Sequence, residues 1–184
     1  DGVLGGSAAA SGERVTPDRA LTFSPWWRGV ALLSQDVGKL PLTVHRVSGT
    51  AKQPAPGHPA YRLLRWEPNP AQTDIQFKQL LTADMLATGN GYAYVWRSRS
   101  GEPLELLPLD PGRVTPLRVG GVTWYAYERE PGAEPRKLPA ADVLHVMGLS
   151  ADGLCGLPVW SYAKEAIGLG LAGKRFQGKR IAGG

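Results

Sequence analysis

Glycine and proline divide this sequence into short segments. The chain has 24 glycines and 16 prolines among 184 residues, well above the share of about 12% that these two residues take in average proteins. Both residues interrupt helices, so a bundle built mainly from helices is excluded. Hydrophobic residues make up 42% of the chain, which is enough to form a core, and the length fits one or two small domains.

Positive charge is concentrated near the C-terminus. The net charge is +5, and residues 164–184 contain five basic residues and one acidic residue. A balance of this size permits an acidic partner without requiring one. No run of about 18 apolar residues occurs, and the N-terminus lacks the charged-then-apolar pattern of a signal peptide, so we expect no membrane partner.

Start and stop signals predict four helices before residue 90. Thr16 and Ser24 each precede a proline, as is typical of helix starts, and we expect the second of these helices to end near Gly38. A short helix is expected over residues 61–66. A longer one is expected over residues 73–89, with a threonine cap at its start and a glycine stop at its end.

The remaining segments before residue 150 favour strands and loops. Alternating apolar and polar residues predict a half-buried strand over residues 42–47, followed by a surface loop over residues 48–59. Further along, β-branched and aromatic runs alternate with turns that contain Gly or Pro. They predict an antiparallel β meander over 92–96, 104–109, 114–119, 122–127 and 143–147. The fold class is therefore α+β, with helices packed on the meander and a long C-terminal helix.

The last segment, from Pro158 toward Ile181, has helical spacing and many small residues. The candidates for close helix packing on its small-residue side are Ala163, Ala166, Gly170 and Gly173. Glycine within a helix costs roughly 1 kcal/mol relative to alanine, so we expect this helix to depend on neighbours for its stability.

The basic residues of the same helix are the candidates for nucleic-acid contact. They are Lys164, Lys174, Arg175, Lys179 and Arg180. Positive charge of this kind suits a phosphate backbone and carries no sequence specificity. A solvated face, or ion pairs to a neighbouring subunit, explain the same residues equally well. An independent module that binds nucleic acid nonspecifically through this helix is therefore an alternative function.

Catalytic and metal-binding patterns are not found in the sequence. The three histidines lie far apart, and no HExxH or CxxC spacing occurs. Cys155 and His145 could form a nucleophile and base, but the apolar neighbours of this single cysteine favour a structural role. A lone cysteine also excludes a disulfide framework. Phosphate-loop and GxSxG motifs are missing, so we expect no enzyme, no metal and no cofactor.

The chain is also rich in tryptophan, with six in all. Such residues can stack on nucleic-acid bases. Four of them lie where elements meet, and we expect most of these in the core: Trp26, Trp27, Trp96 and Trp160. Residues 1–14, in contrast, are mostly Gly, Ala and Ser and predict a flexible arm unless a partner holds it.

A series of short segments follows in a characteristic order along residues 15–182. They are VTP at 15–17, WRGVALLS at 27–34, KLPL at 39–42, HPAYRLL at 58–64, EPNPAQT at 67–73, GNGYA at 89–93, LLPLDPGRV at 106–114, DVLHV at 142–146, DGLCGL at 152–157 and EAIGL at 165–169. By these segments the chain resembles the N-terminal part of tailed-bacteriophage portal proteins of the HK97 type.

The resemblance implies a structural subunit of a portal ring, usually of twelve copies, at one vertex of the capsid. Double-stranded DNA passes through the channel of such a ring during packaging and ejection. The expected partners are other copies of the chain, this DNA, the major capsid protein, the terminase large subunit and the head–tail adaptor. The expected location is the virion, and the host cytoplasm during assembly.

The resemblance also implies a role for each segment. Residues 15–157 correspond to an outer wing domain, and residues 158–184 to the start of the first stem helix beside the channel. The five basic residues then face either the channel or a neighbouring subunit. The family continues beyond this point into the clip, the second stem helix, the tunnel loop and the crown. The sequence leaves open a truncated chain, a processed product or a prophage remnant.

Overall fold

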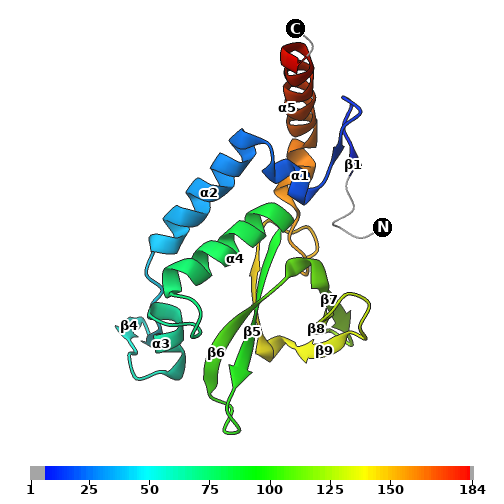
Figure 1. Ribbon diagram of the computed structural model, residues 1–184. Coiled ribbons are helices and arrows are strands. Elements are labelled where there is room, and N and C mark those ends of the chain that lie inside the picture. The colour runs from blue at the N-terminus through cyan, green and yellow to red at the C-terminus, as the bar shows by residue number, and fades with distance from the viewer. Residues whose placement is uncertain (1–6, 183–184) are drawn as a thin grey trace.

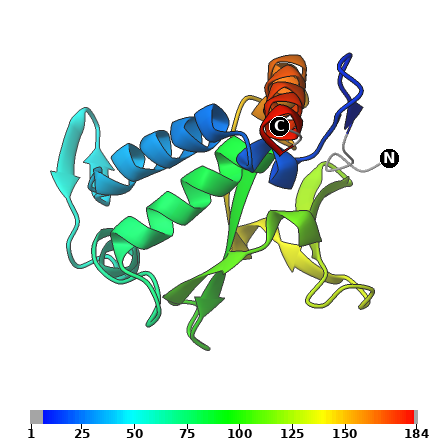
Figure 2. The same cartoon turned by 45° about the horizontal axis from the view of Figure 1, so that its top comes forward.

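A computed structural model describes residues 7–182 of the chain and has the predicted α+β class (Figure 1). The helices are α1 (Pro17–Leu21), α2 (Ser24–Lys39), α3 (Pro59–Arg65), α4 (Asp74–Thr88) and α5 (Val159–Ala182). Helices α2 and α4 run side by side in both views of the ribbon, and α5 extends away from the rest (Figures 1 and 2). The long C-terminal helix of the predicted fold is thus confirmed.

The strands form antiparallel pairs throughout the described part of the chain. They are β1 (Ser7–Ala8), β2 (Arg14–Val15), β3 (His45–Ser48), β4 (Ala51–Pro54), β5 (Asn90–Arg97), β6 (Pro103–Leu109), β7 (Val114–Val119), β8 (Val122–Tyr127), β9 (Arg136–Pro139) and β10 (Val143–Met147). Two three-stranded sheets have the orders β10-β5-β6 and β7-β8-β9, and β1-β2 and β3-β4 are two-stranded. The predicted meander is therefore divided between two sheets, because β10 returns to pair with β5.

The predicted starts of α1 and α4 are confirmed, and local capping explains them. Helix α2 begins at Ser24 as expected but without a side-chain cap, and α3 begins at Pro59, two residues before its expected start. The Thr16 side chain accepts from the Arg19 backbone N–H at the start of α1. Thr73 and Gln76 form a reciprocal capping box at the start of α4. Helix α4 ends at Gly89, whose φ of 88° lies in the left-handed region that favours glycine. These signals depend on residues within one turn of each other, so the sequence alone carries them.

Three hydrophobic clusters form the core. One lies between α4 and the β10-β5-β6 sheet and is built from Leu63, Phe77, Leu81, Ala93 and Leu106. The second joins the two larger sheets and is built from Tyr92, Leu109, Val114, Tyr125, Leu138 and Val143. The third lies at the base of α5 and is built from Ala9, Val15, Ala20, Trp160 and Ile167.

Several local expectations are wrong. The expected loop over residues 48–59 contains β4, which pairs with β3. Strand β3 is exposed along its whole length rather than half-buried, and β9 was not expected at all. Trp27 and Trp96 are 56% and 47% exposed, so these two tryptophans are not core residues. The errors at β3 and the two tryptophans share one cause, because apolar residues were assumed to be covered within this chain. Strands β4 (AKQP) and β9 (RKLP) were missed because they lack the alternating apolar pattern of a strand.

The expected flexible arm is also wrong over residues 7–14. Strands β1 and β2 form a small hairpin, and Ala9 and Glu13 are buried between this hairpin and α5. The arm was expected to be mobile unless a partner held it, and a helix of the same chain holds it. Residues 1–6 lie outside the described residues. The division of the chain at residue 157 into a wing and a stem stays a prediction.

Candidate subunit and nucleic-acid interface

Helix α5 carries all of the predicted site residues and packs on the body only along one side. The side that faces the body contains Trp160, Ala163, Ile167 and Leu171, which contact the N-terminal hairpin and the α1–α2 region. Residues 173–180 are all exposed, but Lys174 and Arg175 still reach the body, and the helix projects beyond the body past these two residues (Figure 1). The helix thus has a covered first half and an uncovered second half.

Two glycines allow the close approach of α5 to the body. A Cβ atom at Gly168 would collide with Ala9 of the N-terminal hairpin, and a Cβ atom at Gly170 would overlap the ring of Phe23. Gly170 was among the expected packing residues and Gly168 was not. At Gly173, a Cβ atom would meet nothing within 4 Å. Glycine spacing alone did not distinguish these positions, because the contacting residues lie about 150 residues earlier in the chain.

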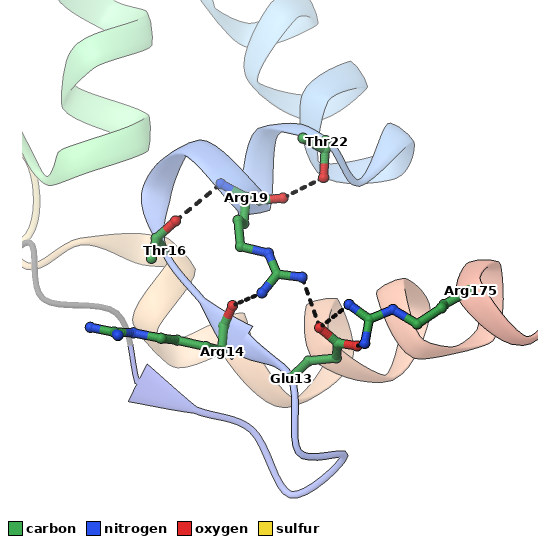
Figure 3. Close-up of polar contacts among 6 residues, drawn as sticks. All are labelled: Glu13, Arg14, Thr16, Arg19, Thr22 and Arg175. Carbon is green, nitrogen blue, oxygen red and sulfur yellow. Dashed lines mark hydrogen bonds and ion pairs between the residues drawn. The ribbon is translucent and has the colours of Figure 1, made fainter.

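Glu13 joins the N-terminal hairpin to α1 through Arg19 and to α5 through Arg175 (Figure 3). Its side chain is only 7% exposed, and Oε1 lies 2.7 Å from Nη1 of Arg175. Arg19 Nη2 donates to Oε2 at 2.8 Å, and Nη1 of the same guanidinium donates to the backbone carbonyl of Arg14 at 2.9 Å. The charge of the buried carboxylate is thus compensated by two guanidinium groups that are 42% and 59% exposed, as a buried charge requires. We call Glu13, Arg19 and Arg175 the Glu13 cluster.

Lys174 and Glu165 add further ties between α5 and the N-terminal segment. Lys174 Nζ donates to Ser24 Oγ at 2.9 Å and to the carbonyl of Thr22 at 3.3 Å. Glu165 Oε2 accepts from the backbone N–H of Ala10 at 2.8 Å. Lys174 and Arg175 are therefore engaged within the chain, whereas the sequence had suggested contact with nucleic acid, a solvated face or ion pairs to a neighbouring subunit.

The other three basic residues differ from these two. Lys164 is half-buried, and Lys179 and Arg180 are exposed. The Arg180 guanidinium lies 6.0 Å from the ring centre of Phe176. The structure therefore does not bring the five predicted basic residues together as one surface: two hold α5 to the body, and the last two lie on the projecting half.

An apolar stripe runs along the outer side of α5. Its large side chains are 42–73% exposed and are those of Val159, Tyr162, Leu169 and Phe176. Ala166 and Gly173 are exposed between them, so that successive members are three or four residues apart. This spacing is typical of a helix that packs against another helix, with small residues opposite large ones. We call these six residues the outer stripe.

The predicted packing residues thus fall into two sets. Ala163 and Gly170 lie on the side that contacts the body, and Ala166 and Gly173 lie in the outer stripe. Sequence reasoning missed the large members of the stripe. A signal was present, because Tyr162, Leu169 and Phe176 are each seven residues apart, and a seven-residue repeat is typical of helix–helix contacts.

Cys155 and the nearby Asp152 have structural rather than reactive surroundings. Burial raises the pKa of the Cys155 thiol, and the Asp152 carboxylate raises it further, so the thiol is held protonated. Backbone N–H groups of Cys155 and Leu154 and the Ser150 hydroxyl lower the pKa of Asp152 to about 2. Asp152 thereby organises a turn.

Within residues 7–182 no three His, Cys, Asp or Glu side chains are grouped to hold a metal ion, and no helix is both long and apolar enough to cross a membrane.

These features define a class of protein. It is an α+β chain with antiparallel sheets and a projecting C-terminal helix, whose surface is apolar where a second helix could pack. The chain belongs to the phage portal protein family, because the model of that family matches residues 24–184.

Individual relatives agree with this assignment. The chain is 31% identical over 160 residues to the portal protein of Enterobacteria phage HK97, covering 86% of this chain and 37% of that protein. It is 30% identical over 188 residues to a probable portal protein of Streptomyces phage phiC31, covering 97% of this chain and 41% of that protein. The chain thus spans less than half the length of these two relatives.

Solved structures share the fold. A chain from the neck of an empty gene transfer agent particle with C6 symmetry superimposes with a TM-score of 0.73 at 22% identity, covering 88% of this chain and 44% of that one. An HK97-family phage portal protein from Corynebacterium diphtheriae gives a TM-score of 0.55 at 19% identity, covering 88% of this chain and 46% of that one. The α+β fold expected from the sequence is therefore confirmed.

Proposed function

We propose that this chain is part of a structural subunit of a portal ring at a capsid vertex, and that the ring forms the channel for DNA packaging and ejection. The observation that carries the proposal is the outer stripe of α5 in a chain of the portal family. Exposed apolar stripes of this length mark contacts with other chains. In a ring, a helix of a neighbouring subunit covers the outer stripe. The chain then serves as a structural part of the channel and catalyses no reaction.

The proposal assigns residues 15–157 to the wing and residues 158–184 to the start of the stem beside the channel. Lys179 and Arg180 lie on the projecting half of α5, where they are the candidates for contact with DNA in the channel. Their contacts are to phosphates and carry no sequence preference. Lys174 and Arg175 are instead assigned to the internal attachment of α5, and Lys164 to a contact between subunits.

The same proposal includes the other partners and the location. The ring contacts the major capsid protein, docks the terminase large subunit during packaging and receives the head–tail adaptor afterwards. Relatives in fold come from neck structures with sixfold and twelvefold symmetry, which supports a ring of twelve copies. The location is then the virion, after assembly in the host cytoplasm.

Charge placed in the outer stripe tests the proposal. Leu169→Glu combined with Phe176→Glu puts two carboxylates where a helix should pack, and this desolvation cost should prevent assembly. Sedimentation velocity should show particles much heavier than the 19.7 kDa monomer for the unmodified protein and monomers for the double variant. Both should unfold at similar temperatures, because the two side chains are exposed within the chain.

A matched control is Val119→Glu at the end of β7, where the side chain is 59% exposed and does not belong to the outer stripe. This variant should assemble as the unmodified protein does. A purified protein that stays monomeric at high concentration, or a double variant that assembles normally, would contradict the proposal.

A further inference from the structure

The loop over residues 148–158 leads from the sheets into α5 and lies tightly against the start of β5. The Gly148 backbone N–H donates to the carbonyl of Gly89 at 2.9 Å, and the Leu157 N–H donates to the carbonyl of Leu149 at 2.6 Å. Gly89 and Gly156 approach so closely that a Cβ atom on either would overlap the backbone of the other. The chain is therefore held at the point where it leaves the body for the helix.

The side chain of Asn90, the first residue of β5, binds both polar groups of Gly156. Asn90 Oδ1 accepts from the Gly156 N–H at 2.7 Å, and Asn90 Nδ2 donates to the Gly156 carbonyl at 3.2 Å. Asn90 is only 8% exposed. The amide thus replaces the backbone partner that these two buried groups require.

His145 on β10 and Tyr125 on β8 fix the orientation of this amide. Because Asn90 Oδ1 accepts from Gly156, the His145 Nε2 that lies 2.9 Å from the same oxygen must carry the proton. In a neutral ring Nδ1 is then an acceptor, so the Tyr125 hydroxyl donates to it at 3.2 Å. Burial lowers the pKa of His145 and raises that of Tyr125, which keeps the imidazole neutral and the phenol protonated.

We propose that the hydrogen-bond chain Tyr125–His145–Asn90–Gly156 sets the direction in which α5 leaves both larger sheets, in addition to the contacts that the N-terminal hairpin makes further along the helix. Tyr125 belongs to the β7-β8-β9 sheet, His145 and Asn90 belong to the β10-β5-β6 sheet, and Gly156 lies in the loop that enters α5. The chain of bonds therefore ties three parts of the molecule together at one point. This inference deepens the proposed function. One consequence rests on that function: in a ring, the direction of α5 would also be the direction of the channel wall.

Amide hydrogen exchange measured by NMR on the purified chain tests the role of Asn90. Asn90→Ala should accelerate exchange of the Gly156 and Leu157 amides by about tenfold or more. The Gly156 N–H loses its acceptor, Asn90 Oδ1, and the neighbouring Leu157 N–H, which donates to the Leu149 carbonyl, is held less firmly in place. Asn69→Ala is the matched control. Asn69 is 5% exposed, donates to the Leu106 carbonyl and accepts from the Ala71 N–H. Asn69→Ala therefore removes a similar pair of hydrogen bonds at a different place in the protein. Equal acceleration at residues 156 and 157 in both variants would overturn the inference.

Tyr125→Phe tests the chain of bonds without removing apolar packing. Loss of the hydroxyl removes the donor that keeps Nδ1 an acceptor, so the population of the Nε2–H tautomer should fall and Gly156 should exchange severalfold faster. Long-range ¹H–¹⁵N spectra of the imidazole report the tautomer directly. An unchanged tautomer with unchanged exchange would show that Tyr125 and His145 do not control Asn90.

These readouts concern the chain itself and do not require a ring. Failure of the protein to assemble would contradict the proposed function and leave the exchange results intact. Normal assembly with unaltered exchange in both Asn90→Ala and Tyr125→Phe would overturn this inference and leave the proposed function standing.

Discussion

Asp84 on α4 is held in an unfavourable ionisation state at neutral pH. Burial, together with the negative charge of Asp110, raises its pKa from 3.8 to about 6. The folded protein therefore binds a proton more readily than the unfolded chain between these two values. Above pH 6 the ionised carboxylate costs folding free energy, and this cost disappears as the pH falls from about 6 to 3.8.

Asp84→Asn should therefore stabilise the protein in a pH-dependent way. At pH 8 we expect the free energy of unfolding to rise by about 1–3 kcal/mol, which corresponds to a shift of this size. The gain should shrink steadily below pH 6. Urea denaturation at pH 8 and pH 4.5 measures both values, with Asp36→Asn on the exposed side of α2 as the control. An equal gain at the two pH values would contradict the assignment.

Residue-scale features were predictable where the partner is close in sequence. The caps at Thr16 and Thr73 depend on residues within one helical turn, so their sequence signals sufficed. The partner of Arg175 is Glu13, 162 positions earlier. No local pattern encodes such a pair, and the sequence therefore showed a basic side chain without showing what neutralises it.

Among the elements, the N-terminal hairpin, residues 7–15, holds α5 against the body. We call this hairpin the strap. It contributes the buried carboxylate of Glu13, the contact between Ala9 and Gly168, and the bond from Ala10 to Glu165. A helix with four internal glycines has little intrinsic stability. The contacts of the strap therefore supply stability that the sequence of α5 lacks, along the helix from Glu165 to Arg175.

Glu13→Gln tests the strap. It removes the charge between two guanidinium groups that are 42% and 59% exposed, so the expected cost is that of losing charged hydrogen bonds at a buried carboxylate, about 1.5–3 kcal/mol. Glu67→Gln is the control, because its pair with Arg62 has the same 2.7 Å separation but is exposed on both sides; its cost should stay below about 1 kcal/mol. Urea denaturation at pH 7 gives both values. Equal costs would mean that the Glu13 cluster contributes no more than a surface pair.

Element types were predicted better than their exposure. The helices were found from caps and spacing, and most strands from turns. Strand β3 is exposed although its alternating pattern suggested that it would be half-buried, and the apolar Leu33 and Val37 of α2 are exposed as well. Periodicity shows which side of an element is apolar. It does not show whether the same chain or another chain covers that side.

At the scale of the whole molecule, the large glycine and proline content serves different purposes in different places. Proline begins helices α1, α2 and α3. Glycine allows the backbone contact of residues 89 and 156 and the close approach of α5 to the hairpin. The division of the strands into the sheets β10-β5-β6 and β7-β8-β9 could not be predicted, because it depends on pairing between β5 and β10, which lie about fifty residues apart in the sequence.

Under the proposed function, copies of this chain assemble into a ring through the projecting helix α5. Negative-stain electron microscopy of the purified protein tests it most directly. We expect annular particles with a central opening and rotational symmetry of sixfold or higher, and their loss in the Leu169→Glu, Phe176→Glu double variant. Particles without an opening, such as monomers or closed dimers related by a twofold axis, would contradict the account.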